Sequence, residues 1–305
     1  MTIKQSETAR VRHVSTLSGA AIATSQRKKQ YPRKSNVREI LPAVLGVIWL
    51  VFACYPIVYM LFTSLRPQAD MYADVPWSFP SHATLSNYAD VLANDFGTYF
   101  ANTVFVTVVS VFMILVVSLL AAYAISQVRN RFTQAVFNLF LLGLAIPLQA
   151  TIIPIYAIVS DLHLYDSLFA LILPSIAFGI PLSILVLVTY IRDIPNELHE
   201  SMMLDGAKHF RILYSLVLPL ARPAIITVII YETIQVWNSF LFPLVLTQSQ
   251  NVQVLPLSLM NFQGQYTTDV PAIMAAVFLS ATPIILLYIF GRRQLLGGLV
   301  AGFSK

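Results

Sequence analysis

The sequence predicts an all-α integral membrane protein with six transmembrane helices. Apolar residues make up 57% of its 305 residues and charged residues only 11%, and the mean hydropathy is +0.72. A soluble domain carries about 25% charged residues, because water must hydrate its surface. The hydrophobicity excludes a disordered chain, and the single cysteine, Cys54, excludes a disulfide-stapled secreted domain. Cys54 lies in an apolar run, where we expect a small buried side chain.

Six apolar runs are the candidate spans. Each has about 20 residues or more, which as a helix cross roughly 30 Å of hydrocarbon. Only helices and closed barrels satisfy the backbone in lipid, and these runs lack the alternation of barrel strands. The predicted spans are residues 40–64, 100–126, 135–159, 168–191, 224–246 and 271–290.

The charges predict the orientation of these spans. Residues 1–38 form a basic tail that holds nine of the 19 Lys and Arg residues, and residues 39–305 form the six-helix membrane domain. The two sides of the predicted spans carry 18 and one of these cations, the single one being Arg66. The positive-inside rule therefore places both termini in the cytoplasm, and it accounts for the basic tail without a nucleic-acid partner.

The sequence lacks the motifs of an enzyme. It has no Gly-rich phosphate loop, no His-Glu-x-x-His motif and no pair of cysteines. The only acidic residue deep within a predicted span is Glu232, so no acid–base pair is available there. We therefore expect no catalytic residue, no metal and no cofactor. The five histidines fall in predicted loops or tails and are expected to be solvated: His13, His82, His163, His199 and His209.

The long loop of residues 191–223 has a helical pattern of its own. Pro195 and Asn196 mark a helix start, followed by acidic residues where the helix dipole favours them. Gly206 then suits a left-handed or tightly packed turn before a second amphipathic segment. Two interpretations stay open: a hairpin on the lipid headgroups, or a docking element with Met side chains as adaptable contacts. The apolar residues of the two segments are Leu198, Met202, Met203, Phe210, Leu213 and Tyr214.

A motif lies within this loop. The run Glu200-Ser-Met-Met-Leu-Asp205-Gly206-Ala207, followed by Leu218-Pro219-Leu220, resembles the EAA motif of ATP-binding-cassette (ABC) importer permeases. That motif usually reads Glu-Ala-Ala, then Asp-Gly-Ala, then Leu-Pro, so Ser201 and Met202 stand in place of the alanines.

Further runs resemble the carbohydrate-uptake branch of these permeases, most closely the second permease subunit of maltose and oligosaccharide importers. They are residues 145–149, 153–156, 170–174, 237–244, 255–256 and 262–269. The last residues, 298–305, depart from the usual Gly-Leu-x-x-Gly-Ala-x-Lys-Gly ending.

The resemblance implies a type I ABC importer permease fold in a bacterial or archaeal cytoplasmic membrane. It also implies a heterodimer with a sister permease, two cytoplasmic ATP-binding subunits that hydrolyse ATP, and an extracytoplasmic protein that delivers a sugar or oligosaccharide. The loop would sit in a cleft of the ATPase and transmit its closure to the spans, in keeping with two discrete packings. The coupling residues that it implies are Glu200, Ser201, Met202, Met203, Asp205, Gly206, Ala207 and Pro219.

Polar residues in the fifth predicted span are candidates for a solute path, because polar groups within a span are costly. Glu232, Gln235 and Ser239 recur at i, i+3 and i+7 on one helical face. Trp237 can stack on a sugar, and Asn238 can hydrogen-bond to hydroxyls. Packing between helices is the alternative role for all of them. The candidates are Trp237, Asn238, Glu232, Gln235, Ser239 and Phe240, with Asn102 and Gln149 as weaker ones.

Two other functions stay open on the sequence alone. One is a permease of the same superfamily that carries a non-sugar solute. The other is a membrane scaffold or receptor whose loop binds a different cytoplasmic partner.

Overall fold

The computed structural model describes residues 37–303 except residues 72, 74, 76, 129 and 263–267. The side chains of residues 37–39 and 290–303 lie outside this description, as do the basic tail up to residue 36 and most of the motif at 262–269. The chain forms two units, Met1–Tyr55 and Pro56–Lys305.

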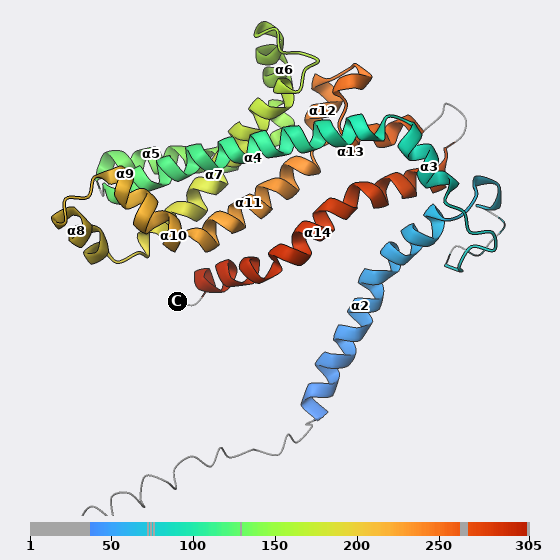
Figure 1. Ribbon diagram of the computed structural model, residues 1–305, viewed down its shortest axis with the longest axis horizontal. Coiled ribbons are helices and arrows are strands. Elements are labelled where there is room, and N and C mark those ends of the chain that lie inside the picture. The colour runs from blue at the N-terminus through green and yellow to red at the C-terminus, as the bar shows by residue number, and fades with distance from the viewer. Residues whose placement is uncertain are drawn as a thin grey trace, which may run out of the picture. The chain divides into compact units, whose positions relative to one another are not determined.

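Helices make up nearly all of the described secondary structure (Figure 1). The α-helices are α2 (Val37–Ser64), α3 (Ser86–Ala93), α4 (Phe96–Gln127), α5 (Arg131–Leu142), α6 (Ile152–Asp161), α7 (Phe169–Arg192), α8 (Asn196–Leu204), α9 (His209–Ile212), α10 (Leu218–Leu220), α11 (Arg222–Trp237), α12 (Leu241–Leu246), α13 (Leu255–Ser258) and α14 (Val270–Phe303). The short 3₁₀ turns are η1 (Gln68–Asp70), η2 (Gly143–Ala145), η3 (Leu148–Thr151), η5 (Gln250–Val252) and η6 (Leu259–Phe262), and η4 (Leu213–Val217) is a π-helix.

The described helices account for four to six membrane spans. Four are long and apolar enough to cross a bilayer alone: Ile40–Ser64, Phe96–Gln127, Leu168–Arg192 and Val270–Ile289. Two bent pairs raise the number to six, namely Arg131–Ala145 with Leu148–Asp161 at 94° and His209–Leu220 with Arg222–Trp237 at 75°. A multi-pass helical membrane protein is therefore confirmed. The 94° bend lies within the predicted third span, whereas the 75° bend, between Leu220 and Arg222, precedes the predicted fifth span.

The predicted third span, residues 135–159, is broken near its middle. Ile146 and Pro147 have extended backbones, with ψ of 115° and 124°, between η2 and η3. The cause is Pro147, which disfavours helical geometry at the residue before it and has no N–H to continue a helix.

The predicted fifth span, residues 224–246, is also broken. Helix α11 ends at Trp237, and α12 begins only at Leu241. Pro243 explains the interruption, because its ring would clash with the carbonyl of residue 239 in a continuous helix and it lacks an N–H.

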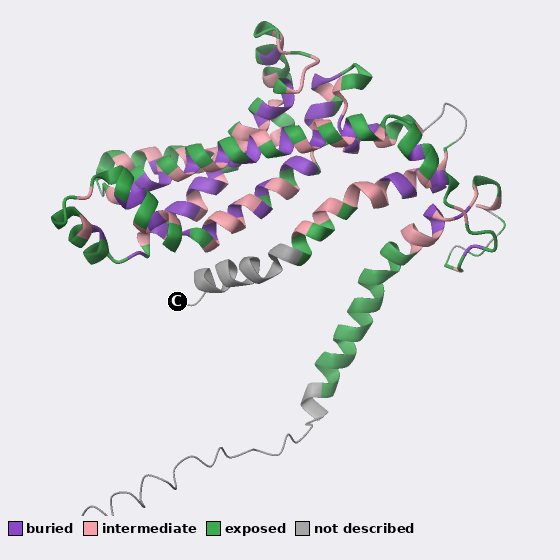
Figure 2. Ribbon diagram, in the orientation of Figure 1, coloured by how far each residue is buried: buried purple, intermediate pink, exposed green. Residues whose placement is uncertain are grey.

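The core of the second unit is built where α4 packs against α7 and α11 (Figure 1). Ala122 of α4 lies in one buried cluster with Ile184 and Leu187 of α7, and buried residues recur along all three helices (Figure 2). Ser110 and Ser118 of α4 are fully buried. Small residues suit such an interface, because lipid gives no hydrophobic drive and close van der Waals packing must hold the helices together.

The connection between α2 and α3 is organised around a buried cation. Arg66 is 1% exposed, and its Nη2 donates to the carbonyl oxygens of Val75 and Ser78 at 3.2 and 3.1 Å. Asn87 of α3 donates from Nδ2 to the carbonyl oxygens of Ser64 and Arg66. Arg66, the single cation on its side of the predicted spans, thus holds this loop together through hydrogen bonds to the backbone.

Cys54 of α2 is exposed within its own unit, contrary to the buried position that we expected. The reason is that α2 shows apolar side chains all round, as a helix in contact with lipid or another protein does.

Candidate functional site

The loop after α7 folds into a helix that ends in a defined stop. Helix α8 begins at Asn196 after Pro195, as predicted, and Asp205 caps its end. Gly206 has φ +78°, the left-handed backbone that its position predicted. Its N–H donates to Met203 O at 3.0 Å, and the N–H of Ala207 donates to Met202 O at 2.9 Å. These two bonds form a Schellman motif, which fixes the direction in which the chain leaves α8.

The inner side of this loop is anchored in the core. His199 of α8 is only 6% exposed, and Met202 and Ala207 pack against the cluster that contains Ile212 and Leu213. The hydroxyl of Tyr123 in α4 donates to His209 O at 3.2 Å. The loop therefore packs against the same buried cluster as α4 and α7.

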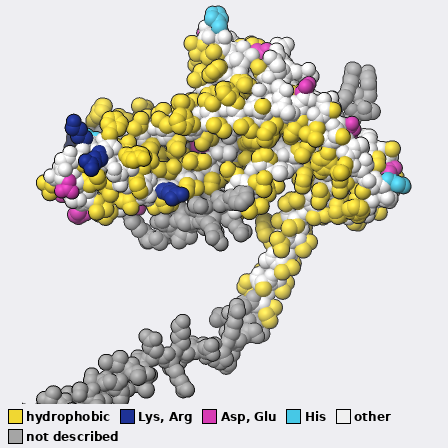
Figure 3. Space-filling model, in the orientation of Figure 1, with side chains coloured by type: hydrophobic (Ala, Val, Ile, Leu, Met, Phe, Trp, Pro, Cys, Tyr) yellow, Lys and Arg dark blue, Asp and Glu magenta, His cyan; other side chains and the backbone are white. Residues whose placement is uncertain are grey.

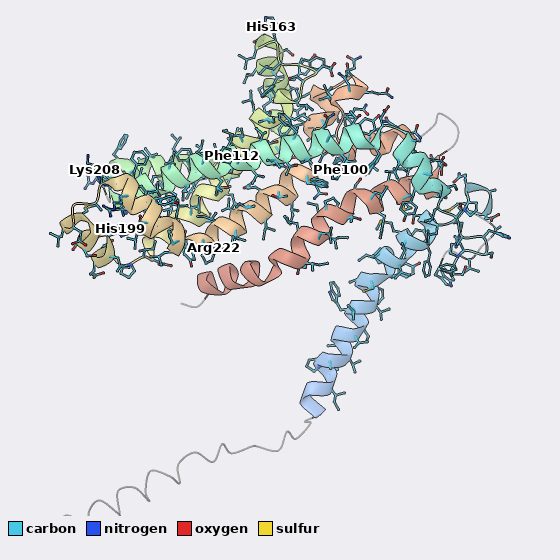
Figure 4. All side chains as sticks on the ribbon, viewed as in Figure 1. Phe100, Phe112, His163, His199, Lys208 and Arg222 are labelled. Atoms are coloured by element: carbon cyan, nitrogen blue, oxygen red, sulfur yellow. The ribbon has the colours of Figure 1, made fainter. Side chains whose placement is uncertain are left out.

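The outer side of the loop presents large apolar residues. Leu204 is 89% exposed, Phe210 80% and Tyr214 76%, while Leu198 and Met203 are exposed to a lesser degree. Figure 4 shows the loop at one end of this unit, with His199 and Lys208 marking it. The motif residues Glu200, Ser201, Asp205, Gly206 and Pro219 are exposed as well.

The structure corrects two details of the sequence-based expectations for this loop. His199 was expected in solvent but lies in α8 on the buried side, with neither ring nitrogen hydrogen-bonded among the described residues. Of the predicted apolar residues of the loop, Met202 and Leu213 face the buried cluster. The other four are exposed, namely Leu198, Met203, Phe210 and Tyr214. The reason is that α8 and α9, with nine and four residues, are too short to bury all the apolar side chains of one face. The Schellman turn between them also changes the direction of the chain.

A cavity of about 180 Å³ lies between α7 and α11, with residues of η2, η3 and α12 completing its wall. Three of the predicted path residues, Glu232, Gln235 and Ser239, line it together, as their shared helical face predicted. Its other polar lining residues are Ser175 and Tyr231. The cavity combines apolar walls with a few hydroxyl, amide and carboxyl groups.

Glu232 is held at the edge of this cavity by α7. Its side chain is 3% exposed, and Ser183 Oγ donates to Glu232 Oε1 at 3.1 Å. A Cβ at Gly179 would lie 2.8 Å from Glu232 Oε2, so the missing side chain makes room for the carboxyl group. The buried carboxyl group of Glu232 thus has a hydrogen-bond partner on the neighbouring helix, as a polar residue within a membrane protein requires.

The other predicted path residues do not join the cavity. Trp237 is 7% exposed, and its indole N–H donates to Ser280 O of α14 at 3.1 Å. Its ring packs edge-on against Phe100 at a centroid distance of 5.9 Å. Asn238 Nδ2 bonds its own helix at Ile234 O, and Phe240 is 39% exposed. Trp237 is therefore packed between α4 and α14, with its indole N–H hydrogen-bonded.

The two weaker candidates also lie elsewhere. Asn102 of α4 donates from Nδ2 to the carbonyl oxygens of Asn251 and Gln253, both at 2.8 Å, and so fixes the segment around η5. Gln149 is exposed in η3. Among the described residues, no group of His, Cys, Asp and Glu could hold a metal ion.

Sequence reasoning missed the α7 side of the cavity. Ser175, Gly179 and Ser183 occur at every fourth residue of α7 and face α11 through the cavity lining and the bond to Glu232. The repeat of small residues at i, i+4 and i+8 was visible in the sequence and is typical of a close helix–helix contact in lipid.

Known proteins are similar to this chain in sequence and in architecture. Residues 114–295 match the family described as "Binding-protein-dependent transport system inner membrane component". The chain is 40% identical over 258 residues to an ABC transporter permease protein of Caldicellulosiruptor sp. (strain Rt8B.4), covering 85% of this chain and 94% of the relative. It is 30% identical over 274 residues to a diacetylchitobiose uptake system permease protein of Streptomyces coelicolor, covering 90% and 99%.

A solved structure agrees as well. The crystal structure of a bacterial ABC transporter involved in the import of the acidic polysaccharide alginate matches with a TM-score of 0.75 and 26% sequence identity. The match covers 86% of this chain and 98% of that chain.

Proposed function

The chain belongs to the family of binding-protein-dependent transport system inner membrane components and is a permease of the carbohydrate ABC importer class; from this premise we propose how its parts divide the work of transport. With a sister permease it forms the membrane path for a sugar or oligosaccharide. The loop around α8 docks on a cytoplasmic ATPase, and a separate solute-binding protein delivers the solute from outside.

The observation that carries this proposal is the two-sided build of the loop. On the inner side, Met202 packs against a buried cluster that includes residues of α4 and α7, and the hydroxyl of Tyr123 in α4 donates to His209 O. On the outer side, Leu204, Phe210 and Tyr214 stand exposed. Soluble faces seldom expose such large apolar side chains together unless a partner covers them. A rigid helix with one anchored face and one open apolar face is suited to transmit the movement of a partner to the spans.

The charge distribution supports a cytoplasmic position for this loop. On the face shown in Figure 3, Lys and Arg side chains lie at the end of the unit that carries α8 to α11. The positive-inside rule places such an end in the cytoplasm, together with both termini. The hydrolysis of ATP falls to the partner, because the sequence has no Gly-rich phosphate loop.

The cavity between α7 and α11 supports a path that needs a second subunit. Small-molecule pockets usually measure about 300–1,000 Å³, and this cavity measures about 180 Å³. Gln235 and Ser239 offer hydrogen bonds to sugar hydroxyls from one wall. We infer that the sister permease supplies the remaining wall.

Co-purification from mild detergent tests the proposal. The tagged chain should bring with it a sister permease and an ATPase that has a phosphate loop. Phe210→Ser with Tyr214→Ser should release the ATPase but keep the sister permease, because both side chains are exposed and lie outside the buried cluster of α4, α7 and α11. As a matched control, Leu139→Ser with Leu142→Ser removes two exposed apolar residues of α5 and should retain the ATPase. Purification of the wild-type chain without an ATPase would contradict the proposal.

A further inference from the structure

A second polar site lies outside the loop and the cavity between α7 and α11. It is an open pocket of about 640 Å³, lined by Asn130, Arg131, Thr133, Gln134 and Arg192. These residues come from the start of α5 and the end of α7. All of its lining residues are polar, and two are cations, so the pocket suits an anion.

Arg192 is held in place by an aromatic ring. Its guanidinium group lies over the ring of Phe137, 5.2 Å from the centroid. Within the part of the chain that the structure describes, its buried Nε has no hydrogen-bond partner, and no carboxylate forms a salt bridge with Arg192 or Arg131. Stacking on an aromatic ring fixes the position of a guanidinium group and leaves its outer N–H groups available.

Arg131 occupies a place that a cation normally avoids. It is the first residue of α5, and the first turn of α5 contains no acidic residue. The positive end of the helix dipole disfavours a cation there and favours an anion. The capping box between Asn130 and Thr133 holds this helix start in place. The helix end and the two arginines therefore concentrate positive charge that a bound anion would neutralise.

The surroundings indicate a lipid as the source of the anion. Phe132, between two residues of the pocket lining, is 74% exposed, and Val128, shortly before them, is 50% exposed, so exposed apolar side chains flank the start of α5. A phospholipid can place its phosphate between the arginines and its acyl chains along this apolar surface. Guanidinium groups bind phosphate by charge-assisted, bidentate hydrogen bonds, and basic pockets at the cytoplasmic side of spans suit anionic headgroups.

We propose that the pocket of Arg131 and Arg192 binds the phosphate group of an anionic phospholipid of the cytoplasmic leaflet. The leaflet assignment rests on the orientation given under the proposed function, whereas the pocket and its chemistry do not. A bound lipid would pin the start of α5 to the end of α7, next to the anchored loop.

The test is lipid binding to the intact, purified transporter. The complex is delipidated, placed in phosphatidylcholine nanodiscs and titrated with a fluorescent phosphatidylglycerol. Arg192→Gln and Arg131→Gln should each weaken binding at this site, and together by about tenfold or more, since each removes a charge-assisted contact. Arg222→Gln is the matched control: it removes one exposed cation of α11 on the same side (Figure 4) and should leave the affinity unchanged.

Further measurements distinguish a lipid phosphate from free phosphate, and the lipid site from the proposed transport function. Millimolar inorganic phosphate should not displace the lipid; displacement at that concentration would mean a site for a soluble anion and would overturn the proposal. Equal affinities for Arg192→Gln, Arg222→Gln and wild type would overturn it too. ATPase co-purification and solute uptake are measured on the same samples, so a failure of the lipid site with normal uptake leaves the transport function standing.

Discussion

Glu232 of α11 and Gly179 of α7 share one space in the helix interface: a Cβ at residue 179 would lie 2.8 Å from Glu232 Oε2. It would also lie 2.5 Å from Cδ1 of Ile114, a fully buried residue of α4. Three helices therefore meet at a position where only glycine fits without displacement.

Gly179→Ala should destabilise the protein by overpacking. The added methyl group must push Ile114 or Glu232 aside, which typically costs about 1–3 kcal/mol in a packed core. The expected result is a lower Tm of the detergent-solubilised protein. Gly97→Ala is the control, because nothing lies within 4 Å of a Cβ there, and it should not lower the Tm. An unchanged Tm for Gly179→Ala would contradict the close packing of α4, α7 and α11.

Glu232→Gln tests whether the carboxyl group is structural. The amide keeps the shape of the side chain and an oxygen that can accept from Ser183, so assembly and uptake should both be preserved. Glu232→Leu removes the acceptor and fills the cavity edge, and it should lower the Tm. A rise in KM for uptake with normal assembly of Glu232→Gln would show that the charge contacts the solute, against this account.

The helical class, the apolar segments and the start of α8 could be predicted from the sequence, because each depends on local patterns. Gly206 is an example: a glycine between two amphipathic segments predicted the left-handed turn that the structure has. The two prolines also indicated the breaks at Pro147 and before Pro243. The spans were predicted as continuous because their bounds were taken from hydropathy, which does not register a proline. The burial of His199 and the hydrogen bond from Trp237 to Ser280 O could not be predicted, since both depend on parts of the chain that are distant in sequence.

Asp166 should make the stability depend on acid pH. Its carboxylate accepts hydrogen bonds from the Ser249 hydroxyl and from the backbone N–H groups of Gln248 and Ser249, which lower the pKa of Asp166 from its ordinary value. A lowered pKa in the folded state means that the stabilisation is present above the unfolded pKa of about 3.9 and is lost as the pH falls through the folded value.

Asp166→Asn should therefore lower the Tm at neutral pH and reduce the further loss of Tm on acidification below about pH 4. Asparagine also tolerates the positive φ of 58° at this position, so the backbone is not the cause. Asp161→Asn, an exposed residue of α6, serves as the control. If both variants show the same pH profile as the wild type, the Asp166 contacts do not stabilise the loop.

The orientation can be measured by cysteine labelling in a Cys54→Ser background. Lys208→Cys should react with a membrane-impermeant maleimide only after the membrane is opened, and Gln250→Cys should react in intact cells. Gln250 is preferable to Thr247 as the outer site, because Gln250 is exposed while Thr247 is 7% exposed. Labelling of Lys208→Cys in intact cells would reverse the proposed topology.

Gly206→Val and Gly206→Asn together test whether the loop of residues 191–223 couples the permease to its ATPase. The space around residue 206 is open, but its φ of +78° strongly disfavours a β-branched residue, whereas asparagine visits this region readily. We expect Gly206→Val to reach the membrane, lose the ATPase in a pull-down and lose solute uptake, while Gly206→Asn keeps most of both. Normal ATPase association and normal uptake of Gly206→Val, measured in the same membranes, would contradict the claim that this loop couples the permease to its ATPase.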